Sequence, residues 1–267
     1  MYLTRGMRIA LRIVVGVILA AAYVPLLVVM INSFNADRAF GWPPSGFTLA
    51  WWSCAAHNAG ALHAVWTSVL VGLCATAVAL VLGALAALSL QRYRFFGRDA
   101  VSLLVILPIA LPGIVTGIAL NNAFRTILGI PLSLLTLVVA HATFCIVVVF
   151  NNVVARLRRL GGDLEEASMD LGADTFTTFR RVTFPLLRTA LLAGGLLAFA
   201  LSFDEIIVTR FTAGQSTTTL PIWILDNLFR PSQAPIVNVV ATVLVVASII
   251  PIAIAQRLSG NASGGRL

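Results

Sequence analysis

Two adjacent carboxylates, Asp204 and Glu205, lie inside a long apolar stretch of the sequence. Ionisable groups within a membrane are costly and usually face a cavity, a partner or a substrate path. Carboxylates beside aromatic rings suit alkylammonium groups, through ion pairing and cation–π contact. The alternative is that the pair only marks a helix end near water, with Arg210 as an ion-pair partner. The candidate substrate path comprises Ser202, Asp204, Glu205, Trp223 and Asp226.

The remaining polar side chains do not predict catalysis. His141 lies in another apolar run, where we expect a hydrogen-bonded core histidine in preference to a proton relay. His57 and His63 have no cysteine or acidic cluster at the spacing of metal ligands. The sequence contains neither a Ser/His/Asp set nor a glycine-rich phosphate loop. We therefore expect a protein that is not an enzyme and that binds no metal and no cofactor of its own.

Composition identifies the solvent in which this chain folds. Hydrophobic residues make up 59% of the 267 positions, charged residues make up 10%, and mean hydropathy is +0.97. A soluble globular domain carries about 25% charged residues. The chain is therefore an integral membrane protein, and we expect an all-α fold because a helix satisfies its own backbone in lipid.

Six apolar runs are each long enough to cross a bilayer, since about 20 helical residues suffice. The third contains Pro108, Pro112, Gly113 and Gly117, which are expected to kink it. The predicted spans are residues 9–31, 62–90, 101–123, 132–154, 186–211 and 236–255.

The arginines indicate which side of the membrane each loop occupies. Six spans place both termini on one side, together with loops 91–99 and 156–188. That side holds 14 of the 18 basic residues, all of which are arginine. By the positive-inside rule, the termini and both loops are expected to be cytoplasmic. The net charge of +8 is thus a topology signal and does not indicate a nucleic-acid patch.

The longest polar interruption is residues 163–185, DLEEASMDLGADTFTTFRRVTFP, called the acidic loop below. Glycines 161–162 are expected to end the helix that precedes it. Asp163 is the predicted N-cap of a first short helix, with Glu166 completing a capping box. Gly172 is placed to end that helix in a left-handed conformation.

A second short helix is predicted after the glycine turn. Thr175 is its expected N-cap, and the helix is expected to extend to Val182. Pro185 then suits the first turn of the fifth span. The acidic loop is therefore predicted to be helix, glycine turn, helix.

The first of these helices is amphipathic. Its apolar face comprises Leu164, Ala167 and Leu171, and its acids are Glu165, Glu166 and Asp170. A helix that rests on an anionic inner leaflet is typically basic. An apolar stripe flanked by acid fits better in a groove on a soluble partner, although an amphipathic linker in the lipid interface is the alternative.

The acidic loop resembles the EAA motif of ABC importer permeases, in which E-A-A is followed after three residues by G and after nine more by I-x-L-P. This chain has Glu166-Ala167-Ser168, Gly172 and residues 182–185 (VTFP) at matching offsets, with conservative departures at 168, 182 and 184. The resemblance implies a coupling helix in a cleft of an ATP-binding subunit. Glu166 would contact a basic group there. The implied coupling residues are Glu165, Glu166, Ala167, Ser168, Asp170, Leu171, Gly172 and Pro185.

Other segments resemble permease subunits of spermidine/putrescine importers. They are residues 23–35, 91–98, 140–145, 201–211 and 220–227. The resemblance implies the type I ABC importer permease fold, an inner-membrane location and polyamine cargo. It also implies a second permease subunit, two ATP-binding subunits that hold ATP–Mg, and a periplasmic substrate-binding protein.

The predicted organisation is a first helix and periplasmic loop (1–61), a permease core (62–256, with its cytoplasmic loop at 156–187) and a short cytoplasmic tail (257–267). Alternative cargoes within the class are aminophosphonates, opines and ferric iron. An ion-driven secondary transporter is less favoured, because residues 1–130 and 131–267 show no internal repeat. An intramembrane enzyme would need catalytic groups clustered across several spans.

Overall fold

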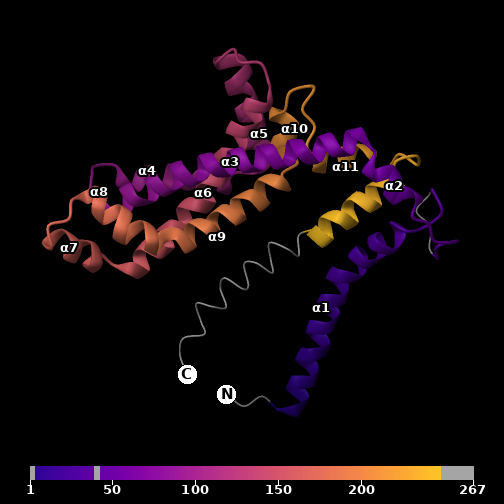
Figure 1. Ribbon diagram of the computed structural model, residues 1–267, viewed down its shortest axis with the longest axis horizontal. Coiled ribbons are helices and arrows are strands. Elements are labelled where there is room, and N and C mark those ends of the chain that lie inside the picture. Colours follow the sequence, from indigo (N-terminus) through magenta and orange to yellow (C-terminus); the bar gives the residue numbers. More distant parts are fainter. Residues whose placement is uncertain (1–3, 39–42, 248–267) are drawn as a thin grey trace. The chain divides into compact units, whose positions relative to one another are not determined.

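The computed structural model describes residues 4–38 and 43–247, and its regular elements are helices (Figure 1). They are α1 (Arg5–Asn32), α2 (Ala50–Ala56), α3 (Ala59–Arg92), α4 (Arg98–Ala110), α5 (Gly113–Asn122), the π-helical turn η1 (Ala123–Ile127), α6 (Leu134–Leu160), α7 (Asp163–Asp170), α8 (Thr175–Thr178), the π-helical turn η2 (Phe179–Thr183), α9 (Phe184–Phe203), α10 (Ile207–Thr212) and α11 (Leu220–Asn227). A further apolar helix covers Ala234–Ala247.

Four uninterrupted helices are long and apolar enough to cross a membrane. They are α1, α3, α6 and the continuous helix Thr175–Phe203. The first, second and fourth predicted spans are thereby confirmed. The described residues contain up to five crossings if the bent pair α4 and α5–η1 counts as one. The end of the sixth predicted span, residues 248–255, lies outside the described residues.

The third predicted span, residues 101–123, is wrong as a single helix. It is divided into Arg98–Ala110 and Gly113–Ile127, with a bend of 108° between them. Leu111 at the break is extended, with φ −82° and ψ 143°. Proline at position 112 disfavours the helical conformation at the residue before it, which explains the position of the break. The expected kink is therefore a full interruption.

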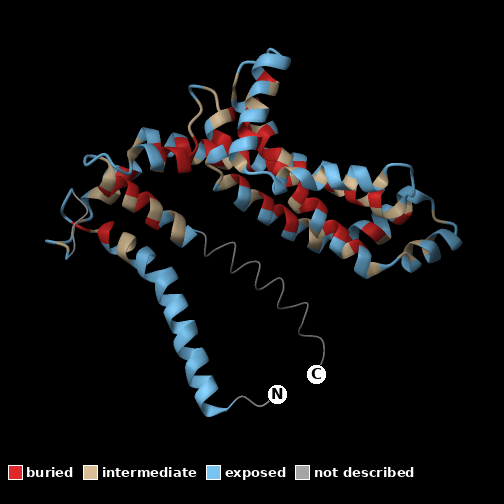
Figure 2. Ribbon diagram, turned by 180° about the vertical axis from the view of Figure 1, so that it is seen from behind, coloured by how far each residue is buried: buried red, intermediate tan, exposed pale blue. Residues whose placement is uncertain are grey.

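The structure divides into two compact units, residues 1–62 with 224–267 and residues 63–223. In the first unit, the end of α1 is held by polar and aromatic contacts. Trp51 donates its indole N–H to the Asn35 carbonyl at 2.9 Å, and Trp52 stacks on Phe34 with ring centroids 5.1 Å apart. Most of α1 itself is exposed (Figure 2), as expected for a helix whose apolar side chains face lipid.

In the second unit, α6 is the central helix and packs along α9 (Figure 1). Over half of its most apolar window is buried, against a third for α3. Its inward side chains include Val149 and Val153, both fully buried, and α3 contributes small residues such as Ala79 to the same core. Small residues allow helix backbones to approach closely in a membrane, where packing is the main stabilising term.

Gly83 shows how close α3 and α6 come. A Cβ atom at this position would lie 2.9 Å from the Ile146 carbonyl oxygen, which belongs to the backbone of α6. A backbone atom cannot move aside as a side chain can, so the helix pair requires glycine here.

Candidate functional site

The acidic loop begins with a helix and a left-handed glycine. Gly172 has φ +86°, and its N–H donates to the Met169 carbonyl at 2.9 Å. The N–H of Ala173 donates to the Ser168 carbonyl at 3.2 Å. These two bonds form a Schellman motif, which confirms the predicted role of Gly172. The predicted capping box is wrong, because Gly162 is the N-cap of α7 and Asp163 is its first residue.

The second helix of the loop differs from the prediction in two ways. Its N-cap is Asp174, whose carboxylate accepts the Thr177 N–H at 3.1 Å, and Thr175 is the first helical residue. The helix does not stop near Val182, since η2 connects it directly to α9. Pro185 lies in the first turn of α9, as expected. Proline has no N–H for a regular helical bond, and a π-helical turn immediately before it accommodates that gap.

Glu165 faces the protein. Its carboxylate pairs with the Arg92 guanidinium at the end of α3 and accepts the Thr183 hydroxyl at 2.8 Å. Ser168 also has an internal partner, because its hydroxyl lies 3.0 Å from the hydroxyl of Thr178 across the glycine turn. The serine that departs from the E-A-A pattern therefore closes the loop on itself.

The opposite side of the acidic loop is open to a partner. Leu171 is 91% exposed, Phe176 is 68% exposed, and Leu164 is also exposed. The carboxylates of Glu166 and Asp170 lie among these apolar side chains on the exposed surface. An apolar patch with acidic neighbours of this kind indicates a protein interaction site.

The carboxylates Asp204 and Glu205 do not lie within a helix, which corrects the predicted fifth span. Helix α9 ends at Phe203 and α10 begins at Ile207, so the two acids form a break between them. The Glu205 carboxylate accepts the Val208 N–H at 2.9 Å and so caps α10. Within the described residues, the exposed Asp204 side chain forms no ion pair or hydrogen bond. The two acids therefore have different roles.

A buried chain of hydrogen bonds spans this break. His141 of α6 lies 2.7 Å from the Ser202 hydroxyl and 2.9 Å from the Thr209 hydroxyl. Thr209 donates its proton to the Glu205 carbonyl at 2.8 Å. Its oxygen must then accept from Nε2–H of His141, and Nδ1 of the neutral ring accepts from Ser202. The expected core histidine is confirmed, and its position shows that it joins α9 to α10.

The small residues that precede Glu205 on α9 serve for packing. Ala198 is fully buried, and its carbonyl accepts the Cys145 thiol at 3.3 Å. Ser202 is buried and bonded to His141, and Trp223 is buried as well. Asp226 is exposed and belongs to the other unit. Of the predicted path residues in residues 63–223, Asp204 is thus the one whose polar atoms are open.

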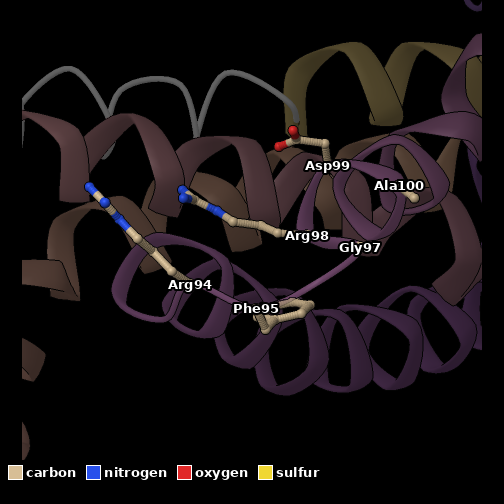
Figure 3. A pocket seen from close by; sticks show the side chains of 6 residues that line it. All are labelled: Arg94, Phe95, Gly97, Arg98, Asp99 and Ala100. Atoms are coloured by element: carbon tan, nitrogen blue, oxygen red, sulfur yellow. The ribbon is translucent and has the colours of Figure 1, made fainter.

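A separate depression of about 290 Å³ lies at the connection between α3 and α4. Arg94 and Arg98 extend their guanidinium groups toward the same side, whereas Asp99 points away from them (Figure 3). Two adjacent cations favour an anion over a cation. This depression is therefore not a site for an alkylammonium cargo.

Three residues that complete these sites could not be predicted from the sequence. Arg92 and Thr183 hold Glu165, and Thr209 connects His141 to the break. Arg92 lies 73 positions from Glu165 in the chain, and a single sequence carries no signal for such a pair. Thr209 is one of four consecutive β-branched residues, and nothing in that pattern distinguishes a packing threonine from a hydrogen-bonding one.

Comparison with known proteins relates the chain to membrane components of transport systems. Residues 79–261 match the family model described as binding-protein-dependent transport system inner membrane component. The chain is 35% identical over 248 residues to the spermidine/putrescine transport system permease protein PotC of Escherichia coli (strain K12), covering 93% of each chain. It is 31% identical to the putative 2-aminoethylphosphonate transport system permease protein PhnV of Salmonella typhimurium, covering 84% of this chain and 86% of the relative.

The fold is also similar to a solved structure. A bacterial ABC transporter involved in the import of the acidic polysaccharide alginate contains a chain that superposes with a TM-score of 0.71 at 16% identity. The superposition covers 98% of this chain and 99% of the other. The all-α fold is thus that of an ABC importer permease.

Proposed function

Because this chain belongs to the family of binding-protein-dependent transport inner membrane components, and is a multi-pass permease subunit of that class, we propose that it forms part of an ATP-driven importer of polyamines. The acidic loop is the observation that carries the ATP-driven role. It presents exposed apolar and acidic side chains on a short helix that is closed by a Schellman motif. This is the form of a helix that docks in a groove of a second protein.

The proposed complex contains a second permease, two ATP-binding subunits and a periplasmic substrate-binding protein. ATP–Mg is bound by the ATP-binding subunits, and this chain binds no cofactor. The arginine distribution supports cytoplasmic termini and a cytoplasmic acidic loop. Closure of the ATPase dimer draws two such loops together and opens the membrane helices toward the binding protein, so that this subunit supplies differential contacts in two global states.

Polyamine cargo is supported by the exposed Asp204 carboxylate at the break between α9 and α10. Each ammonium group of a polyamine can form an ion pair with this carboxylate, whereas an aminophosphonate joins one ammonium group to an anionic phosphonate that the carboxylate repels. The likeness to the phosphonate permease supports aminophosphonate as the second candidate cargo. Opines and ferric iron are further alternative cargoes for an importer of this class. The identities to the polyamine permease and to the phosphonate permease differ too little to identify the cargo. Asp204 is therefore the residue to test.

The test is uptake in vesicles that contain the whole complex and its binding protein. We expect radiolabelled putrescine or spermidine to be taken up when ATP is enclosed with the ATP-binding subunits, and 2-aminoethylphosphonate not to compete. Asp204→Asn should lower uptake at low substrate concentration by about tenfold, the value of one charge-assisted bond of about 1.4 kcal/mol.

Glu205→Gln is the matched control, because a glutamine oxygen still accepts the Val208 N–H. Its uptake should fall by about threefold or less, which corresponds to under 1 kcal/mol. Equal loss in both variants, with the complex intact, would show that the break is structural and that Asp204 does not contact cargo. Competition by the phosphonate would transfer the proposal to that cargo.

A further inference from the structure

Arg92 joins four segments of the second unit at one point. This last residue of α3 donates one nitrogen to the Gly161 carbonyl at 3.2 Å, at the end of α6. A second nitrogen pairs with Glu165 of α7, and the same Glu165 oxygen accepts the hydroxyl of Thr183 in η2 at 2.8 Å. The Arg92 junction, defined as Arg92, Gly161, Glu165 and Thr183, therefore connects α3 and α6 to the acidic loop and to the start of α9.

The surroundings of this junction make it more than a surface ion pair. The side chains of Arg92 and Glu165 are 26% and 18% exposed. Exposed pairs contribute little because water screens them, and partial burial strengthens the attraction. Arginine also presents several donors in a planar fork, so that one side chain reaches two acceptors on different elements. Lysine, with a single ammonium group, does not reproduce this geometry.

Helix α7 has few other attachments. None of its residues is buried, so apolar packing does not hold it against the membrane helices. Within the described residues, its side chains are linked to the rest of the unit by the Arg92 junction and by the hydrogen bond between Ser168 and Thr178. Of these two, the junction alone reaches α3, whose residues 63–92 belong to this unit.

We propose that Arg92 is a positioning residue that transmits movement of the acidic loop into α3 and α9, a proposal that rests on the proposed function. When a partner moves α7, the Glu165 carboxylate moves with it. Arg92 then carries the displacement to the end of α3, and Thr183 carries it to the helix that continues as α9. Without the junction, α7 moves with its partner while the membrane helices stay in place, and ATP is hydrolysed without transport.

The test measures uptake per ATP hydrolysed in the complete reconstituted complex with its binding protein and putrescine. Arg92→Gln should retain co-purification of the ATP-binding subunits and ATP hydrolysis while uptake per ATP falls by about tenfold, within the range of coupling between distant sites. Arg92→Lys should fall nearly as far. Arg94→Gln is the matched control, since it removes one arginine from the same connection and leaves the junction intact, and it should match wild type.

A mutant cycle separates transmission from folding. If both residues act through one pair, the double variant with Glu165→Gln should lose no more uptake per ATP than Arg92→Gln alone. Wild-type uptake per ATP in Arg92→Gln would overturn the proposal. So would a parallel fall in assembly, hydrolysis and uptake, which would make the junction a purely structural contact. The wild-type chain is measured first. If it neither co-purifies with ATP-binding subunits nor supports putrescine uptake, the proposed function is overturned as well.

Discussion

The acidic loop and the break at Asp204–Ile206 both interrupt a helical path, yet they are stabilised by opposite chemistry. At the loop, a charged pair between Arg92 and Glu165 joins α7 to α3, and the side chains are partly open to water. At the break, the buried neutral side chains of His141, Ser202 and Thr209 form a hydrogen-bonded chain that joins α9 to α10.

The difference follows from the cost of moving a charge out of water. A partly exposed ion pair such as Arg92 and Glu165 keeps part of its hydration, so that the cost of desolvation is small. Within the bundle the same pair would lose that hydration, and neutral donors and acceptors are cheaper to bury. Glu205 is a charged group at the break, and its carboxylate accepts a backbone N–H at the start of α10. Substitutions in the loop should therefore act through charge, and substitution of His141 should act through hydrogen-bonding capacity.

His141→Leu should give the largest effect on stability. It removes two interhelical bonds and leaves the buried hydroxyls of Ser202 and Thr209 without their partner. Such bonds contribute about 0.6–2 kcal/mol each in membranes, so the expected destabilisation is about 2–3 kcal/mol. The measurement is reversible unfolding of the purified subunit in mixed micelles.

Thr143→Ala on the same helix is the control for His141. Its hydroxyl donates only to the Ala140 carbonyl within α6, at 2.7 Å. The expected loss is under about 0.5 kcal/mol, as for a hydroxyl that bends back onto its own helix. Equal destabilisation by both substitutions would mean that the hydrogen bonds of His141 do not stabilise the connection between α9 and α10.

Gly172→Ala should have an intermediate effect, confined to the acidic loop. The left-handed φ of +86° costs a residue with a Cβ about 1–2 kcal/mol. No atom lies within 4 Å of the added Cβ, so backbone strain is the whole penalty. Asparagine tolerates this conformation better and should lie between glycine and alanine. Hydrogen exchange of the Gly172 and Ala173 amides measures the opening of the turn directly.

Gly162→Ala tests whether substitution of any glycine in this segment would open the turn at Gly172. Its φ is −111°, and an added Cβ would make only ordinary contacts, the nearest at 3.5 Å from Glu166. Exchange at the Schellman amides should stay at the wild-type rate. A comparable increase in both variants would indicate that general loosening of the loop, and not the handedness of one residue, controls the turn.

Much of the fold was predictable because membrane helices are encoded locally. Apolar runs located α1, α3 and α6, and the glycine at 172 predicted the turn that the structure shows. At Leu111 the prolines predicted a kink, and the structure has a full break there. The break at Asp204 was not predicted, because it is stabilised by hydrogen bonds to His141 of another helix.

In the candidate sites, too, local backbone features were predictable from the sequence and contacts between distant segments were not. Gly172 and Pro185 act through their own backbones, and their positions followed from the sequence. The caps at Gly162 and Asp174 were each displaced by one residue from the prediction, since several neighbouring side chains are able to cap a helix. The role of Arg92 could not be predicted from the sequence, because it depends on a contact between segments that are distant in the chain.

Asp174 gives the smallest expected effect and the clearest test of the charge-sensitive side of the comparison. Its pKa is lowered from 3.8 by the hydrogen bond with the Thr177 side chain and by that with the Thr177 backbone N–H. A lowered pKa means that the ionised cap favours the folded loop above pH 3.8, and that this contribution is lost as the pH falls through the folded-state pKa. Exchange of the Thr177 amide should therefore accelerate, beyond the intrinsic pH effect, only in acid below that value.

Asp174→Asn separates the charge from the cap. Asparagine is an equally good N-cap and does not titrate in this range, so the acid-dependent term should vanish while exchange at neutral pH changes little. An acid-dependent opening at the Thr177 amide that persisted unchanged in Asp174→Asn would contradict the assignment of this pH dependence to the Asp174 carboxylate.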